Sequence, residues 1–132
     1  MYLDRLFKLM AEKQASDLFI SCGAPINIKI NGVVSPISTQ PMDVETVRRI
    51  AYELMSKEQA REFENELEMN LSYLDRAVGN FRINIFRQRG TISLVIRYVR
   101  SRVPPFEALK LPSVLLNLVM EKRGLVLIAG AT

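Results

Sequence analysis

The spacing of apolar residues in the first part of the chain predicts a helix followed by a hairpin. Within "MYLDRLFKLMAEKQ" apolar side chains recur every three or four residues, which indicates an amphipathic helix. "SDLFIS" and "INIKI" predict strands, and Asn31–Gly32 after the second of these is a strong hairpin signal. The return strand is "VVSPI", in which Pro36 favours a position at the edge of a sheet.

The middle of the chain predicts two capped helices. Asp43 is placed to cap a helix that runs through Met55. Ser56 and Gln59 have the spacing of a capping box, which predicts the start of a second helix. A second run of strands is expected to begin near Met69.

The segment "GNFRINIFRQRGTISLVIRYV" predicts an antiparallel hairpin with its loop at Arg89–Gly90. This register makes one face wholly apolar, with three opposed pairs: Phe81 and Tyr98, Ile83 and Ile96, Ile85 and Leu94. A slip of one residue would turn the whole apolar set outward, so the pattern determines the register.

The other face of this hairpin places Arg82 directly opposite Arg97. Like charges at opposed positions destabilise a sheet by roughly 0.2–1 kcal/mol. One interpretation is a solvated face on which water and salt screen the repulsion. The other is a pair of guanidinium groups that bind one multivalent anion, for which a phosphate chain is the obvious candidate.

The last part of the chain predicts a linker and the opening of a second unit. Two prolines at 104 and 105 interrupt regular structure, and a helix is expected from Leu111–Pro112 to Lys122–Arg123–Gly124. "GLVLIAGAT" then predicts a buried strand that runs into a glycine loop. The order of elements indicates an α+β domain followed by the start of something else, as though a longer protein had been cut.

Composition restricts the chemistry. The 132 residues are 48% apolar, which is enough to bury one core. The net charge of +4 and the isoelectric point near 9.5 fit either a site for an anionic partner or a mildly basic surface with no such site. No histidine is present, which excludes Ser-His-Asp catalysis and histidine-ligated metals. Cys22 is the only cysteine, so no intrachain disulfide can form and a reducing compartment is expected. No segment reads as a signal peptide or membrane span, which favours the cytoplasm.

Five segments in the same order give the chain a family resemblance. They are "ASDLFISCGAPINIKINGVV", "FRINIFRQRG", "VIRYV", "LKLPSVL" and "KRGLVLIAGAT", and together they resemble the type IV pilus retraction ATPases over essentially the whole sequence. "LKLP" and "GAT" are closer to the PilU branch of this family than to the PilT branch. Gly130, Ala131 and Thr132 resemble the start of the phosphate-binding loop, Gly-x-x-x-x-Gly-Lys-Ser/Thr. The loop lysine and the family's later acidic and histidine motifs are absent from the sequence.

The resemblance implies a PAS-like N-terminal domain over residues 1–100, a linker over 101–111 and the start of a RecA-like ATPase domain over 112–132. Members form hexameric rings in which ATP and Mg lie between the two domains, and hydrolysis drives pilus retraction and twitching motility. In this family, arginines of the N-terminal domain contact the nucleotide phosphates. They lie in the hairpin that corresponds to that of Arg82 and Arg97 here, so the resemblance implies a catalytic role for these two residues. Arg100 is a weaker nucleotide-binding candidate, as is Arg102.

The resemblance also implies partners and a location for the longer protein. Other copies of the chain, the inner-membrane platform protein of the pilus and a paralogous retraction ATPase are the expected partners, on the cytoplasmic side of the inner membrane. Neither nucleic-acid binding nor membrane insertion is expected, and no metal site is assigned to this chain. The 132 residues alone are expected to bind no cofactor and to hydrolyse nothing.

Two other classes of function stay open on the residues alone. A free-standing PAS-like sensor would need an interior apolar pocket with convergent polar groups. A nucleic-acid-binding module would suit the basic charge, but the hairpin aromatics Phe81 and Tyr98 are expected on the core face, which leaves no evident stacking platform.

Overall fold

The computed structural model describes residues 2–99 and 104–130 of the chain. These residues form two compact units, Met1–Ser101 and Arg102–Thr132. No helix in the described ranges is both long enough and apolar enough to cross a lipid bilayer. The mixed α+β class expected from the order of the elements is confirmed in the first unit.

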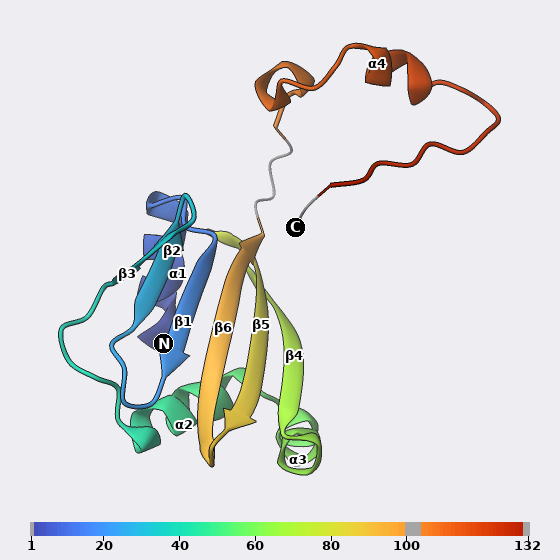
Figure 1. Cartoon of the computed structure of the whole chain (residues 1–132). Coiled ribbons are helices and arrows are strands. Elements are labelled where there is room, and N and C mark those ends of the chain that lie inside the picture. Colours follow the sequence, from blue (N-terminus) through green and yellow to red (C-terminus); the bar gives the residue numbers. More distant parts are fainter. Residues whose placement is uncertain (1, 100–103, 131–132) are drawn as a thin grey trace. The chain divides into compact units, whose positions relative to one another are not determined.

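The first unit is built on one six-stranded antiparallel sheet (Figure 1). The strands follow the order β3-β2-β1-β6-β5-β4, so β1 and β6 are neighbours at the centre although they are far apart in sequence. The strand bounds are β1 Asp17–Ser21, β2 Asn27–Ile30, β3 Val33–Pro36, β4 Glu68–Asp75, β5 Gly79–Gln88 and β6 Thr91–Val99. Pro36 lies on the edge strand β3, as predicted.

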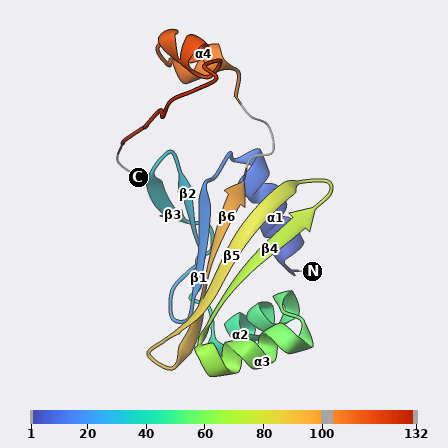
Figure 2. The ribbon, with the colours of Figure 1, turned by 90° about the vertical axis from the view of Figure 1, so that its right-hand side faces the viewer.

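Three helices bury their apolar faces against the sheet in a single core. They are α1 Tyr2–Glu12, α2 Val44–Leu54 and α3 Lys57–Glu66, and Figure 2 shows them from the side of β4. Phe7 of α1 stacks on Phe81 of β5 with ring centroids 4.2 Å apart, and both side chains are fully buried. Phe63 of α3 and Ile50 of α2 join the same cluster. The core therefore lies on one face of the sheet, and the three helices pack against that face.

The local signals for the helix starts are confirmed. Asp43 caps α2 by accepting a 2.8 Å hydrogen bond from the backbone N–H of Thr46. Hydrogen bonds from Thr46, from its side chain first and then its backbone, lower the pKa of Asp43. Ser56 and Gln59 form the predicted capping box at the start of α3. These caps satisfy backbone donors that the first turn of a helix leaves without partners.

The β5–β6 hairpin has the predicted register. Phe81 pairs with Tyr98, Ile83 with Ile96 and Ile85 with Leu94. Five of these six side chains are at most 1% exposed, and Tyr98 packs partly buried against them. Burial of this set on one face fixes the opposite face, which includes Arg82 and Arg97.

The second unit differs from the sequence prediction. It contains a short 3₁₀ helix, η1 Phe106–Leu109, and one α-helix, α4 Val114–Leu118, which is shorter than the helix expected up to Gly124. The buried strand expected after Gly124 is absent from the described residues, and Leu125 and Ile128 are 82% and 87% exposed. An apolar strand needs a neighbouring strand for its hydrogen bonds, and the described residues of this unit offer none.

We predict that Gly79→Ala destabilises the first unit because β5 begins there against Tyr98. A Cβ at this position would lie 2.9 Å from Tyr98 Cε2, and Gly79 has a φ of +138°. The Tyr98 hydroxyl donates a 3.0 Å hydrogen bond to the Val78 carbonyl, so the ring cannot move away without losing it. Urea unfolding should show a loss of about 2–4 kcal/mol from strain and steric overlap.

Gly32→Ala is the matched control for this variant. Gly32 also has a positive φ, +83°, but a Cβ there would meet no atom within 4 Å. Backbone strain alone should cost about 1–2 kcal/mol. Equal losses in the two variants would show that the contact with Tyr98 has no steric effect.

Candidate functional site

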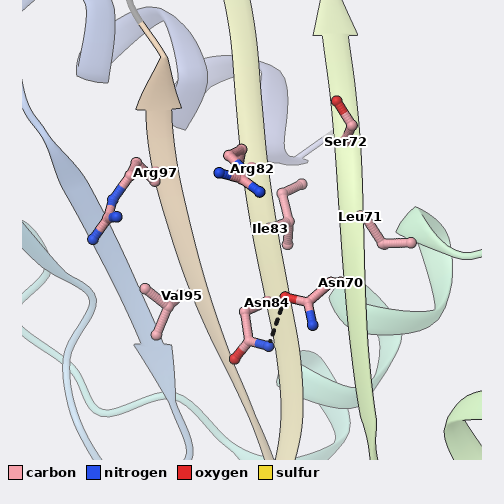
Figure 3. Close-up of a pocket in the computed structure, with 8 residues that line it drawn as sticks. All are labelled: Asn70, Leu71, Ser72, Arg82, Ile83, Asn84, Val95 and Arg97. Carbon is pink, nitrogen blue, oxygen red and sulfur yellow. Dashed lines mark hydrogen bonds between the residues drawn. The ribbon is translucent and has the colours of Figure 1, made fainter. Parts of the chain in front are cut away.

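The sheet face opposite the core carries a pocket over β4, β5 and β6 (Figure 3). Its volume is about 500 Å³, and the helices of the first unit pack on the other face. The lining residues are Asn70, Leu71, Ser72, Arg82, Ile83, Asn84, Val95 and Arg97. The pocket thus combines two cationic side chains with amide, hydroxyl and apolar groups on a regular sheet.

Arg82 and Arg97 occupy directly opposed positions on β5 and β6, as the sequence predicted. Arg82 is exposed, and it makes no ion pair or side-chain hydrogen bond with any other described residue. Arg97 differs, because its Nε donates a 2.9 Å hydrogen bond to Oδ1 of Asp17. Figure 3 shows the Arg97 guanidinium directed toward β1 and away from Arg82. The strands therefore place the two residues side by side, but the guanidinium group of Arg97 points to Asp17 and not to Arg82.

Asp17 is the counter-ion that sequence reasoning missed. It lies on β1 directly opposite Arg97, and its other cross-strand neighbour is Lys29 of β2. The Asp17 side chain is only 8% exposed, whereas that of Arg97 is 68% exposed. A buried carboxylate is costly unless it is paired and hydrogen-bonded. Arg97 therefore has a contact within the fold in addition to its predicted place at an anion site, because it pairs with a buried charge.

The other end of the pocket is formed by amide side chains. Asn84 Nδ2 donates to Oδ1 of Asn70 at 3.1 Å and to Oε1 of Glu68 at 2.9 Å. Figure 3 shows the bond between the two asparagines on neighbouring strands β5 and β4. The pocket therefore grades from cationic to neutral polar along the strands, which suits a ligand with an anionic part and a polar part.

A second arginine of β5, Arg87, is held away from this pocket. Arg87 Nη2 donates to both carboxylate oxygens of Glu64, at 2.9 and 2.8 Å. Its guanidinium carbon also lies 5.8 Å from the ring centroid of Phe63, a residue of the core. Arg87 thus joins α3 to the sheet on the core face, and its charge is neutralised there.

The remaining predicted site residues belong to the end of the chain or to undescribed positions. Gly130 lies in the second unit and is exposed. Arg100, Arg102, Ala131 and Thr132 lie outside the described residues, so their predicted roles in nucleotide binding stay predictions. Within ranges 2–99 and 104–130, no group of three or more Asp, Glu, Cys or His side chains is placed to hold a metal.

Known proteins resemble this chain in sequence and structure. It is 39% identical to the type IV pilus ATPase PilU of Pseudomonas aeruginosa and 33% identical to PilT, a type IV pilus retraction ATPase of the same organism. Both matches span the whole chain but only 35% and 38% of the relatives, so the chain spans about a third of their length. No family model matches the sequence.

Solved structures agree with these sequence matches. The crystal structure of the pilus retraction motor PilT with bound ADP superposes with a TM-score of 0.74 at 30% identity, covering 89% of this chain and 34% of that one. The ATPase DotB of Legionella pneumophila gives the same TM-score at 18% identity over 93% of this chain and 36% of its own, which supports the fold alone.

We predict that the two arginines differ in their effect on stability. Arg97→Ala leaves the buried Asp17 without its hydrogen-bonded cation, so the free energy of unfolding should fall by about 1–3 kcal/mol. Arg82→Ala removes an exposed side chain without a described partner and should change it by less than about 0.5 kcal/mol. Urea unfolding of the chain measures both values.

The double variant Asp17→Asn/Arg97→Ala serves as the control. It removes the buried charge together with its partner and should regain most of the stability lost in Arg97→Ala. If the double variant is as unstable as the single one, the loss does not come from the unpaired carboxylate.

Proposed function

We propose that this chain, which belongs to the PilT/PilU family of type IV pilus retraction ATPases, acts at the nucleotide site of a pilus retraction motor. Its identity to PilU exceeds that to PilT, 39% against 33%. In this proposal residues 1–100 are the N-terminal domain, 101–111 a linker, and 112–132 the start of an ATPase domain. Gly130, Ala131 and Thr132 open its phosphate-binding loop.

The observation that carries the proposal is the pairing of Arg82 and Arg97 on an open sheet face. The guanidinium group presents a planar set of donors that matches phosphate oxygens, and it stays charged at all physiological pH values. An arginine that reaches the transferred phosphoryl group stabilises the charge of the transition state, with effects of about 10³–10⁵-fold on rate in other nucleotide hydrolases. The role assigned to Arg82 and Arg97 is this charge stabilisation.

The nucleotide in the proposed site is ATP with Mg. The PilT structure contains ADP, which supports a nucleotide in the family. The pocket of about 500 Å³ has room for a phosphate chain beside the two arginines. The described residues provide no acidic cluster for a metal, so no residue of this chain is assigned to Mg.

The wider proposal concerns the assembled motor. Copies of the longer protein form a hexameric ring, and ATP hydrolysis changes the angle between the domains to drive pilin removal. The ring acts on the cytoplasmic side, against the pilus platform protein and beside a paralogous retraction ATPase. These partners follow from the family membership and not from a surface of this chain.

The burial of two of the three aromatic residues of the hairpin, with Phe86 alone on the open face, favours this proposal over nucleic-acid binding. Phe81 is fully buried in the core, and Tyr98 is partly buried with its hydroxyl bonded to Val78. Single-stranded nucleic acid is bound largely by stacking on exposed aromatic rings. These two rings are not available for that role.

We expect Arg82→Ala to lower ATP turnover by ~10²-fold or more in a protein that continues through the ATPase domain, since a preorganised charge donor is lost. Arg97→Ala is tested in the Asp17→Asn background, which removes the unpaired carboxylate, and should lose turnover similarly. Phosphate release at saturating ATP is the measurement. Arg61→Ala on α3 removes an equal charge at an exposed position and should keep normal turnover. Normal turnover in both pocket variants would refute the assignment.

We also expect that a polypeptide of these 132 residues alone hydrolyses no ATP. It contains neither the lysine of the phosphate loop nor, in its described ranges, a metal-binding acidic cluster. Phosphate release with excess ATP and Mg should equal that of buffer. Turnover above this background that disappears in Arg82→Ala would show that the chain carries a complete catalytic site.

A further inference from the structure

The contact between Arg97 and Asp17 determines what an anion would meet in the pocket. The Nε of Arg97 is committed to Asp17 at 2.9 Å, and its guanidinium points toward β1 (Figure 3). Its two η nitrogens have no hydrogen bond to another described residue. In this state Arg97 is held beside a carboxylate and directed away from Arg82.

Arg82 differs from Arg97 because no described side chain holds its guanidinium group. It is exposed and has no described partner, so its guanidinium can meet an incoming anion at once. An anion seated between Arg82 and Arg97 must draw the head of Arg97 back toward β5. Asp17 and the anion would then both attract the same guanidinium group.

We propose that Asp17 competes with the bound anion for Arg97, so that Arg97 becomes a phosphate ligand by exchanging partners. This inference rests on the proposed function of the arginine pocket and adds to it a residue that governs anion affinity. Arg82 is the ligand available from the start, and Arg97 is recruited. The anion class is a polyphosphate, whose several negative charges can outweigh one carboxylate.

The surroundings of Asp17 allow this exchange. The Arg97 side chain is 68% exposed, so its head can rotate without disturbing the core. Lys29 is the cross-strand neighbour of Asp17 on its other side, so β2 carries a second cationic residue directly opposite Asp17. The partner exchange therefore does not leave the buried carboxylate remote from positive charge.

A consequence is that Asp17 weakens anion binding while it stabilises the fold. Asp17→Asn keeps the shape of the side chain, removes the competing charge and leaves Arg97 at most a neutral hydrogen bond to the amide oxygen, which holds it less tightly. Asp17→Asn should therefore bind the anion more tightly, whereas it would bind more weakly if Asp17 only held Arg97 in a productive orientation. In that case the loss of the anchor would weaken binding.

The test titrates the 132-residue chain with sodium tripolyphosphate at about 0.15 M ionic strength, where the Debye length is about 8 Å, and follows the arginine Nε–Hε resonances by NMR. In the natural sequence, tripolyphosphate should shift the Arg82 and Arg97 signals, and the Arg97 signal should move toward its position in ligand-free Asp17→Asn. In Asp17→Asn the dissociation constant should fall by about 3- to 10-fold, because one nearby negative charge is gone.

Glu64→Gln is the matched control. It removes the same charge from another arginine–carboxylate pair, that of Arg87, on the core face of β5. Its effect on tripolyphosphate affinity should stay within about twofold, since charges more than a Debye length apart are largely screened. Equal tightening in both variants would mean that net charge alone controls affinity, and the proposal would be wrong.

The outcomes separate this inference from the proposed function. If tripolyphosphate shifts neither arginine signal, the anion site itself fails. If both signals respond but Asp17→Asn binds with equal or weaker affinity, the site stands and the competition is refuted. An Arg97 Nε–Hε signal that stays unchanged while that of Arg82 shifts would show that Arg97 never leaves Asp17.

Discussion

The register of the β5–β6 hairpin is the constraint on which the candidate site depends. Six side chains of the hairpin share the core face, and the pairing of Ile83 with Ile96 is at its centre. Full burial of such a side chain contributes about 1.5–3 kcal/mol, so a slip of one residue would expose several of them at a cost that no surface contact could offset. The position of Arg82 opposite Arg97 follows from this burial, and their mutual repulsion is small beside it.

The pairing of β1 with β6 then determines how that repulsion is managed. β1 places Asp17 next to Arg97, so the charges across the sheet alternate from Arg97 to Asp17 to Lys29. Arg82 at the other side has no such neighbour, since its partner on β4 is Ser72. The sheet order thus makes two arginines of identical chemistry unequal: one stabilises a buried carboxylate, and the other is free of described partners.

Local patterns predicted most of the first unit, and long-range pairing accounts for what they missed. The caps at Asp43 and Ser56 and the register of the β5–β6 hairpin depend on residues close in sequence, and their predictions are confirmed. The Asp17–Arg97 pair joins residues 80 positions apart. Nothing in "SDLFIS" indicates which strand lies beside it. The apolar run after Gly124 forms no strand within the described residues for a related reason, because such a run becomes a strand only where another strand can pair with it.

The inequality of the two arginines bears differently on the stability of the fold and on the proposed binding of phosphate. An arginine without a partner retains its rotamer freedom, and ordering it on a ligand costs conformational entropy. An arginine held by a carboxylate has already lost much of that freedom, but it must exchange one charged partner for another. Lysine could not replace either residue equivalently, because it lacks the planar group that can face Asp17 through Nε while its η nitrogens face elsewhere. The guanidinium of Arg97 thus pairs with Asp17 through Nε and keeps its η nitrogens without a hydrogen bond to another described residue.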